Sequence, residues 1–309
     1  MNQLFREIST LTTEKNNPAT RDIDTLSTRD ILLKINDEDA KVAGAVREEI
    51  ENITVAVDKI AEAFKNGGRL IYAGAGTSGR LGIVDASECP PTYGTPPEMV
   101  QAIIAGGTPA IFQAQEGAED SRELAAKELD ILKVSEKDIV CGIAASGRTP
   151  FVIGALEEAK KRGAYTILVS TNSRENLLKS DAGKFADTLI CPQVGPEVIA
   201  GSTRMKSGTA QKLVLNMLTT GAMIRIGKTY GNVMVDLQLT NEKLKERAKA
   251  ILMNLADADY ETAEETLKQT NGNVKTALVM LLTGADLATA EELLKDSGGL
   301  IKEVLKKVE

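Results

Sequence analysis

Histidine is absent from all 309 residues of this chain. Its absence excludes catalytic arrangements that need a histidine base, such as Ser-His-Asp or Cys-His, and metal sites that need imidazole ligands. Acid–base chemistry in this protein must therefore come from Asp, Glu, Lys, Tyr or Cys side chains.

Aromatic residues are scarce as well, at 3% of the sequence, and there is no tryptophan. Hydrophobic residues nevertheless reach 42%, so a sizeable core must be built from Ala, Val, Ile and Leu. Such a core is typical of a parallel sheet that is covered by helices. The length is sufficient for about two domains.

Cysteines are few, and positive charge is not in excess. The three cysteines, Cys89, Cys141 and Cys191, show no metal-binding spacing, and we expect all three to be packed, unreactive thiols. The net charge of −7, without a basic cluster, argues against a nucleic-acid partner. A phosphorylated ligand must therefore be held by local donors and not by a broad positive field.

Long apolar segments are missing too. The first ten residues, MNQLFREIST, lack the apolar region of a signal peptide. The chain has no uninterrupted run of about 18 apolar residues, the length that a membrane-spanning helix needs. We therefore expect a soluble cytoplasmic protein with no membrane partner.

The most informative segment that is present covers residues 74–93, GAGTSGRLGIVDASECPPTY. It follows an apolar run over residues 70–73 that predicts a buried strand, and a helix is expected to begin near Thr77. This strand, turn and helix order forms a phosphate cradle, because glycines admit the ligand while amide N–H groups and hydroxyls donate to its oxygens.

The same arrangement occurs a second time. An apolar run over residues 140–145 leads into Ser146, Gly147, Arg148, Thr149 and Pro150, which predicts another strand, small-residue turn and helix start. Two such turns in one domain indicate a single phosphorylated ligand that is bound from two sides.

The rest of the chain alternates between expected strands and helices. We expect strands over residues 69–73, 100–105, 138–144, 165–170 and 188–191, with helices between them that include 120–132 and 150–162. A long helix is expected over residues 39–65, after a short helix capped by Ser27. This alternation predicts an α/β fold with a mostly parallel sheet, whose ligands bind at the carboxyl ends of the strands.

The C-terminal part differs in character. Residues 203–227 predict a helix that is apolar nearly all round, which indicates a core or a subunit interface. From residue 252 onward we expect three or four short amphipathic helices, with Asn273 and Asp286 as N-caps. The expected division is an N-terminal helical lead-in over residues 1–50, a domain that contains both phosphate turns over 51–240 and a helical domain over 241–309.

Three acidic segments border the expected ligand edge. They are the run from Asp85 to Thr92, the run EGAED over residues 116–120, and Glu197 ahead of GSTR at residues 201–204. An ordinary acidic residue caps a helix or lies in solvent, and that explanation remains open for Asp85 and Asp120. The run DASECPP is less easily explained in that way, because its proline pair restricts the backbone as a positioned carboxyl group requires.

The chain resembles a known family along nearly its whole length. The segments LIYAGAGTSGRLGIVDASECPPTYG, AEDSRE, GIAASGRTP and GSTRMKSGTAQKLVLNML are similar to those of the N-acetylmuramic acid 6-phosphate etherases, which have the sugar isomerase (SIS) fold. The resemblance implies an SIS-type parallel-sheet sandwich with flanking helices. It also implies a small C-terminal all-α domain that is similar to a ubiquitin-associated module and packs against the enzyme or covers a dimer.

The resemblance further implies a lyase that cleaves the D-lactyl ether of its substrate to N-acetylglucosamine 6-phosphate and D-lactate, in the recycling of cell-wall sugars. It implies no metal and no organic cofactor, and a homodimer is expected because SIS proteins usually dimerise. The family's proton donor maps to Glu88, and its other catalytic residue maps to Glu119.

Phosphate-binding residues are carried over from the wider superfamily. Ser78, Ser146 and Thr149 match the hydroxyls that hold phosphate there. The related S-x-S-G-x-T pattern has Ala144 at its first position in this chain, so one donor is lost, and Thr77 or Arg148 is expected to replace it. Arg148 is equally well explained as a surface salt bridge.

Two other functions are considered. An aldose–ketose isomerase of the same fold keeps a glutamate at the position of Glu197, which makes Glu197 and the nearby Ser202 candidate sugar-binding residues. Such isomerases generally also use a histidine, which this chain lacks. A non-catalytic sugar-phosphate sensor, resembling glucokinase regulatory protein, is the other alternative, and the presence of both Glu88 and Glu119 favours the enzyme.

Overall fold

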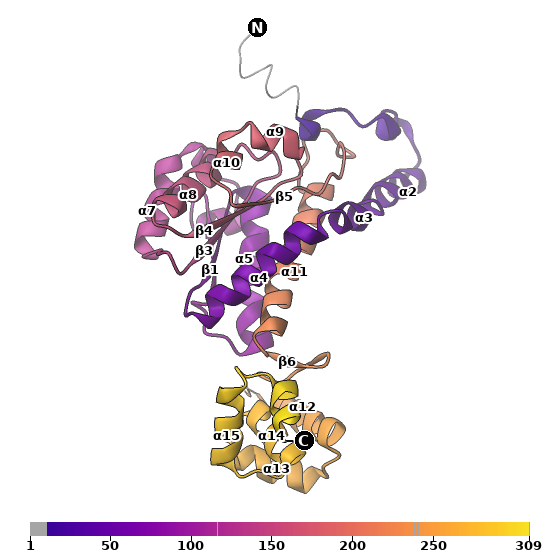
Figure 1. Cartoon of the computed structure of the whole chain (residues 1–309). Helices are drawn as coiled ribbons and strands as arrows, with labels where there is room; N and C mark the ends of the chain where they lie inside the picture. Colours follow the sequence, from indigo (N-terminus) through magenta and orange to yellow (C-terminus); the bar gives the residue numbers. More distant parts are fainter. Residues whose placement is uncertain (1–10, 116, 238, 240, 309) are drawn as a thin grey trace. The chain divides into compact units, whose positions relative to one another are not determined.

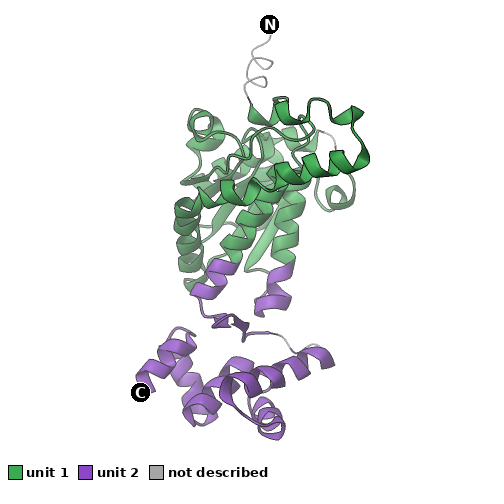
Figure 2. Ribbon diagram, turned by 90° about the vertical axis from the view of Figure 1, so that its right-hand side faces the viewer, with its two compact units in different colours: residues 1–87, 98–219 green, residues 88–97, 220–309 purple. Residues whose placement is uncertain are grey.

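Figure 1 shows the computed structural model of the chain, which describes residues 11–115, 117–237, 239 and 241–308. The chain forms two compact units (Figure 2): Met1–Ser87 with Glu98–Thr219, and Glu88–Pro97 with Thr220–Glu309. Part of the expected N-terminal lead-in, Glu116 of the acidic run EGAED and residue 240 at the expected domain boundary lie outside the described residues.

The first unit contains a five-stranded parallel sheet in the order β2-β1-β3-β4-β5. All five expected strands are confirmed, with ends shifted by one residue or so. Strand residues are almost continuously buried, as expected when helices cover both faces of a parallel sheet. The bounds are β1 (Leu70–Gly74), β2 (Val100–Ile104), β3 (Ile139–Ile143), β4 (Tyr165–Val169) and β5 (Thr188–Ile190).

Helices cover the two faces of this sheet. On one face α7 (Arg122–Ile131) and α8 (Pro150–Lys161) bury alanines and aliphatic side chains against Ile71 and Ala73 of β1. On the other face α5 (Gly76–Tyr93) lies close enough that a Cβ atom at Gly82 would be 3.0 Å from Tyr72. Figure 1 shows α4 (Ile50–Lys65) and α11 (Lys206–Arg225) on the side of the sheet where α5 lies. The α/β sandwich expected from the sequence is therefore confirmed.

The connections define where a ligand is expected. After β1 the chain crosses through α5 to β2 on one side, and after β2 it crosses through α7 to β3 on the other side of β1. The order of strands thus reverses between β1 and β3. In open α/β sheets the ligand crevice lies outside the carboxyl ends of the strands at such a reversal. Both expected phosphate turns begin at these two strand ends.

The single long helix expected over residues 39–65 is wrong. The structure has α2 (Thr28–Asp39), α3 (Val42–Arg47) and α4, preceded by the short turns η1 (Thr12–Glu14), η2 (Pro18–Thr20) and η3 (Ile23–Thr25). Acidic residues lie at both breaks, Asp37 to Asp39 in the last turn of α2 and Glu48 with Glu49 after α3. Negative charge is unfavourable at the negative end of a helix dipole. The Ser27 side chain accepts from the Asp30 amide, so Ser27 is the N-cap of α2, as expected.

The last turn of α2 also carries a buried charge. Glu38 is 3% exposed, and its Oε2 accepts from Lys206 Nζ at 2.5 Å and from Asn17 Nδ2 at 2.9 Å, while Lys41 donates to Oε1. Burial by itself raises the pKa of Glu38, but the hydrogen bonds from Lys206, Lys41 and Asn17 outweigh it and lower the pKa to about 2. Lys206, at the start of α11, is 1% exposed.

We expect this pair to make folding stability depend on pH. A carboxyl with a depressed pKa stabilises the fold above its unfolded-state value, and that contribution is lost as the pH falls toward the folded-state value. The free energy of unfolding should fall by about 3 kcal/mol between pH 4.5 and 2. Glu38→Gln should remove this part of the slope and cost about 3–5 kcal/mol at neutral pH, because Lys206 is left buried without its counter-charge. Urea unfolding at several pH values measures both effects, and an unchanged slope in the variant contradicts the assignment.

The second unit contains a hairpin and a helical cluster. The hairpin pairs β6 (Thr229–Tyr230) with β7 (Val233–Met234) around Gly231 and Asn232, a two-residue turn with Gly231 at φ 59°. Sequence analysis did not predict this hairpin, although the Gly-Asn pair is a turn signal. The helices are α12 (Glu242–Ala256), α13 (Tyr260–Gln269), α14 (Val274–Thr283), α15 (Leu287–Asp296) and α16 (Ile301–Val308).

The expected helical tail is confirmed, but the expected number of helices is wrong. The described part of the tail has five helices beginning at Glu242, because Asn241 caps α12 and its charged first half continues into the buried Ala248, Ile251 and Leu252. Asn273 and Asp286 accept from the amides of Thr276 and Thr289, so both are N-caps as expected. Within the described part of the chain, no helix is long and apolar enough to cross a membrane.

Candidate functional site

In the turn after β1, the backbone at the end of the strand lies very close to the backbone of the first turn of α5. A Cβ atom at Gly74 would lie 2.7 Å from the Gly79 amide nitrogen, so the strand end and the first turn of α5 pack together only because both residues are glycine. Gly76, at φ 54°, begins α5. The helix start expected near Thr77 is therefore confirmed. The first N–H groups of a helix have no partner within the helix, and here they lie at the carboxyl end of β1.

Ser78 lies in this first turn and is nearly buried. Its hydroxyl donates to Gln211 Oε1 of α11 at 2.9 Å. Thr77 lies beside the same helix, because a Cβ atom at Gly208 would lie 3.4 Å from Thr77 Cγ2. The first turns of α5 and α11 therefore meet at the expected phosphate site, a contact that the sequence did not predict.

The turn after β3 has the expected layout. Thr149 is the N-cap residue of α8 and makes no side-chain capping bond, and Pro150 is the first residue of the helix. Ser146 Oγ accepts from the Arg148 amide at 3.2 Å. Gly147 has φ 69°, and a Cβ atom there would lie 2.2 Å from Leu177 Cδ2, so only glycine fits.

The segment after β4 holds this second turn in place. Ser170 Oγ and the Thr171 amide both bond to the Ala145 carbonyl, at 2.9 and 3.1 Å. Asn172 Nδ2 donates to the Ser146 carbonyl at 3.0 Å. A fixed turn needs little ordering when a ligand binds, which lowers the entropic cost of binding.

A cavity of about 560 Å³ lies beside the second turn. Gly147, Arg148 and Asn172 line it together with Arg122, which is paired with Asp181 at 2.8 Å. The cavity combines backbone, amide and guanidinium donors next to the expected hydroxyls of Ser146 and Thr149. This donor set suits an anionic, hydroxyl-rich ligand.

Glu119 lies at the same sheet edge, next to the first turn. It belongs to the short 3-10 helix η4 (Ala118–Asp120), which follows Gly117 at φ 74°. Its side chain is exposed and lines a cavity of about 200 Å³ together with Gly76 and Arg80. Arg80 is held there because its Nε donates to the Ile111 carbonyl at 2.9 Å. Ser121, and not Asp120, caps the following helix α7.

Glu88 has a different setting from the one expected. The run from Asp85 to Thr92 was expected to border the ligand edge of the sheet, but it lies within α5, which continues through Pro90 and Pro91 to Tyr93. The helix tolerates the two prolines, which donate no amide hydrogen bond within it. Glu88 is exposed on this helix, while Cys89 beside it is buried.

Asp85 is a buried structural carboxylate. Tyr72 Oη of β1 and Asn216 Nδ2 of α11 each donate to it at 2.8 Å, and Thr219 Oγ1 donates at 3.2 Å. Burial raises the pKa of Asp85, although these three hydrogen bonds oppose the rise. Asp85 therefore joins the sheet, α5 and α11, and is not the helix cap considered from the sequence.

Glu197 is fully buried, and both of its carboxylate oxygens are used. Oε2 accepts from the Lys206 amide at 3.0 Å and Oε1 from the Ser207 amide at 2.8 Å, so Glu197 caps the N-terminus of α11. This placement does not support direct contact with a sugar. Ser202, the other candidate, is half-buried in the preceding turn.

The thiols do not belong to the site. Cys89, Cys141 and Cys191 are buried and form no disulfide with one another. Burial raises the pKa of the Cys191 thiol to about 12 and that of Cys141 still further. A thiol in this state is a poor nucleophile and a poor metal ligand. The expectation that these residues serve as packing thiols agrees with their burial.

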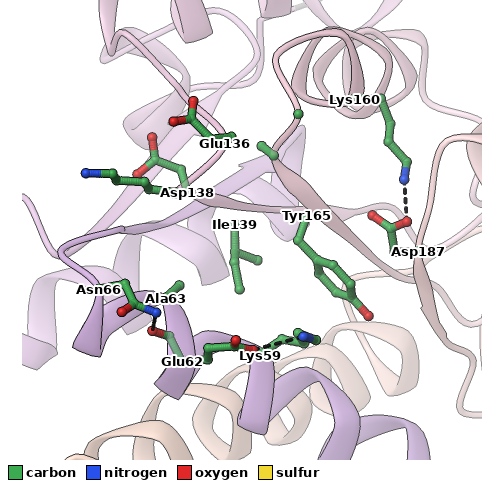
Figure 3. A pocket seen from close by; sticks show the side chains of 13 residues that line it. Lys59, Glu62, Ala63, Asn66, Glu136, Asp138, Ile139, Lys160, Tyr165 and Asp187 are labelled. Carbon is green, nitrogen blue, oxygen red and sulfur yellow. Dashed lines mark hydrogen bonds and ion pairs between the residues drawn. The ribbon is translucent and has the colours of Figure 1, made fainter.

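A separate pocket lies at the opposite edge of the sheet (Figure 3), with a volume of about 550 Å³. It is formed around the starts of β3 and β4, where Ile139 and Tyr165 line it. Its charged groups are largely paired with each other or with neighbours, as Lys59 is with Glu62 and Lys160 with Asp187. Because ligands of α/β sheets bind at the carboxyl ends, this amino-end pocket is not the candidate site.

Several residues of the site could not be found from the sequence. Gln211, Asn172 and Arg80 contribute side chains to it from three separate elements. None of them lies in a pattern that indicates chemistry. Only the packing of α11 on α5, and of the segment after β4 on the second turn, brings them to the ligand edge.

Several known proteins are similar to this chain. Residues 52–160 match the family model described as the glucokinase regulatory protein N-terminal SIS domain. The N-acetylmuramic acid 6-phosphate etherase of Clostridium botulinum (strain Okra / Type B1) is 58% identical over 268 residues, which cover 87% of each chain. The etherase of the same name from Salinibacter ruber is 57% identical over 276 residues, 89% of this chain and 87% of that protein. A phosphoheptose isomerase from Francisella tularensis is structurally similar with a TM-score of 0.46 and 20% identity, covering 62% of this chain and 98% of that chain.

Proposed function

The chain belongs to the N-acetylmuramic acid 6-phosphate etherase family, and from this premise we propose that it cleaves the D-lactyl ether of N-acetylmuramic acid 6-phosphate. The products are N-acetylglucosamine 6-phosphate and D-lactate, and water is consumed. The observation that carries the proposal is that Glu119 shares a cavity with Gly76 of the first phosphate turn. A carboxyl group and a phosphate-binding helix start then act on one substrate.

The proposed reaction has two stages. In the open-chain form of the sugar, the aldehyde makes the C2 proton acidic, so a carboxylate removes it and the bond between C3 and the lactyl oxygen breaks. A carboxyl group protonates that oxygen, which is otherwise a poor leaving group. Water then adds at C3 of the unsaturated aldehyde. General acid and general base catalysis each contribute about 10²–10⁴ in rate.

We assign the base to Glu119 and the acid to Glu88. The assignment of Glu119 is supported by its position on a short element that lines a cavity together with Gly76 of the first turn. Glu88 is exposed on α5, and it is the residue to which the family's proton donor maps. Neither role needs an imidazole, which fits a chain without histidine.

The phosphate is proposed to lie between the two turns. This is supported by α5 and α8 beginning after the carboxyl ends of the neighbouring parallel strands β1 and β3, with Thr77 and Ser78 in the first turn of α5 and with Ser146 and Thr149 just before α8. Backbone amides, hydroxyls and the positive end of each helix dipole are the usual donors to such a group. The N-terminus of α11 is not a third donor, because Glu197 already occupies it.

The function is tested by incubating the protein with N-acetylmuramic acid 6-phosphate and measuring D-lactate. Release of D-lactate, with none from unphosphorylated N-acetylmuramic acid at the same concentration, is the expected result. A ketose product without lactate would instead indicate an aldose–ketose isomerase. Binding of the sugar phosphate without any product would indicate a regulator, the activity that the name of the matched SIS domain suggests.

We further propose that the enzyme is a homodimer. Val84 of α5 and Met217 of α11 are 56% and 38% exposed, next to the buried Asp85 and Asn216 that join these helices. Exposed apolar side chains on neighbouring helices favour association with a second copy. Sedimentation should give a dimer that Met217→Glu weakens, and a monomeric wild-type protein contradicts the proposal.

We also place the reaction in the cytoplasm, because a charged sugar phosphate does not cross a membrane unaided and must be used where it is formed. Cell fractionation followed by the lactate assay tests this. Activity confined to the membrane fraction contradicts it.

A further inference from the structure

A buried side-chain amide lies beside the first phosphate turn, and only its oxygen is hydrogen-bonded. Gln211 of α11 is 1% exposed, and its Oε1 accepts from the Ser78 hydroxyl at 2.9 Å. Its Nε2 is buried and has no hydrogen-bond partner among the residues that the structure describes. A buried amide donor that is left unpaired costs about 1–3 kcal/mol, so it needs an explanation.

The position of this amide points to a ligand. Oε1 and Nε2 belong to one planar group, so Nε2 lies within about 5 Å of Ser78 Oγ. Ser78 is in the first turn of α5, where the helix N–H groups lack helical partners. The unpaired donor is therefore next to the helix start that the two-turn arrangement assigns to phosphate.

The hydrogen atoms available at this site can be counted. A serine hydroxyl has one hydrogen to donate, and in this structure Ser78 gives it to Gln211. A phosphate oxygen at neutral pH is chiefly an acceptor. Ser78 therefore cannot donate to phosphate while it donates to Gln211, and the donor left over in this pair is the Gln211 amide.

We propose that Gln211 and Ser78 act as one unit and that the Gln211 amide supplies the hydrogen with which this unit binds the phosphate. In the present orientation Nε2 itself donates to a phosphate oxygen. If the amide turns over, Nε2 donates to Ser78 Oγ and the Ser78 hydroxyl donates to the phosphate. In both orientations the pair gives one hydrogen to the ligand while Ser78 and Gln211 stay bonded to each other. The inference deepens the proposed function and rests on it.

In the ligand-free protein the unpaired amide of Gln211 lowers the stability of the fold. A measurement of stability can therefore separate a role in binding from a role in structure. Gln211→Met keeps the length of the side chain and removes the unpaired buried donor. The melting temperature should therefore stay the same or rise, because an apolar group of similar shape replaces an unsatisfied polar one. Functional positions commonly show this opposition between stability and activity.

Ligand binding is tested with Gln211→Glu. This variant should raise KM for N-acetylmuramic acid 6-phosphate at least about tenfold, with kcat within about twofold, because Ser78 then donates to the carboxylate and the pair has no hydrogen left for phosphate. Gln211→Met should raise KM by less than about twofold, because it frees the Ser78 hydroxyl to donate to the phosphate. Gln269→Glu, the same change at an exposed position on α13, is the matched control and should leave KM unchanged.

Coupling between the two residues is the sharper test. If they act as a unit, each can supply the hydrogen when the other is removed. Ser78→Ala and Gln211→Met should then each raise KM by less than about twofold, and the double variant should raise it about tenfold. A double variant whose KM rises by no more than the product of the two single effects overturns the idea of a unit. A normal KM in Gln211→Glu, together with a lowered melting temperature in Gln211→Met, overturns the binding role and leaves a structural one.

Binding of N-acetylglucosamine 6-phosphate, measured by calorimetry without turnover, separates this inference from the proposed function. A wild-type protein that binds this sugar phosphate but releases no lactate refutes the etherase function. In that case tenfold weaker binding by Gln211→Glu still supports the role of Gln211, and equal binding by both proteins refutes it.

Discussion

Glu88→Gln should lower kcat by at least about a hundredfold while KM for N-acetylmuramic acid 6-phosphate changes little. Glutamine keeps the shape of the side chain but cannot protonate the departing lactyl oxygen, so the loss occurs in the transition state and not in substrate binding. Glu88 is exposed on α5, where a change from carboxylate to amide removes no buried contact. Steady-state release of D-lactate measures the effect.

The control for this variant is Glu98→Gln, the same change at another exposed position. It should retain wild-type kcat, and both proteins should have the melting temperature of the wild type. Near-normal lactate release by Glu88→Gln would falsify the assignment of the acid, even if the protein remains an etherase.

Glu119→Gln should abolish exchange of the C2 hydrogen of the substrate with solvent. In D₂O the wild-type enzyme should place deuterium at C2 of the recovered N-acetylglucosamine 6-phosphate, because the base that removes the proton exchanges it with water. Glu119 lies in the cavity with Gly76 and Arg80, where a sugar held by its phosphate at the first turn presents its carbons. An amide is not a base, so this exchange should fall by about 10²–10⁴.

Comparison with Glu88→Gln tests which of the two glutamates is the base and which is the acid. Protonation of the ether oxygen comes after or together with removal of the C2 proton, so Glu88→Gln should keep part of the exchange that Glu119→Gln loses. Mass spectrometry of substrate recovered from D₂O measures this in both variants, with Asp120→Asn as the neighbouring control. Normal exchange in Glu119→Gln together with none in Glu88→Gln means that the two roles must be swapped. Normal exchange in both removes Glu119 from this step.

The strands could be predicted because their signal is local. Each is a short apolar run ended by small or polar residues, and a strand buried on both faces needs only such a run. The N-caps Ser27, Asn273 and Asp286 were predicted for the same reason, since a cap is a bond between residues three positions apart. Strands and caps of this kind can be predicted from the sequence, because they depend on near neighbours in the chain.

Helix ends and short hairpins were predicted less well. Acidic residues lie at the two breaks that divide residues 28–65 into α2, α3 and α4. One of them, the buried Glu38 in the last turn of α2, forms an ion pair with Lys206 of α11. That ion pair joins residues 168 positions apart in the chain. Apolar periodicity over a short window contains no information about such a partner.

The acidic residues show the same limit more clearly. Four acidic residues lie next to segments of small residues: Asp85, Glu88, Glu119 and Glu197. The fold makes Asp85 a buried link between β1, α5 and α11, makes Glu197 the cap of α11, and leaves Glu88 and Glu119 exposed. Glu88 and Glu119 were chosen as catalytic candidates because of the resemblance to a family. No local sequence pattern separates them from Asp85 and Glu197.

By itself the sequence determined the α/β class, the two turns proposed to bind phosphate, the exclusion of imidazole chemistry and the helical tail, because each depends on composition or on contacts between near neighbours. The tertiary structure decided which side chains lie beside those turns. Gln211 is 133 residues from Ser78 in the chain, and it reaches Ser78 only because α11 packs on α5, while glycines at positions 74 and 79 let β1 and α5 approach closely. Contacts between distant segments depend on how the helices pack on the sheet, and no single segment of the chain specifies that packing.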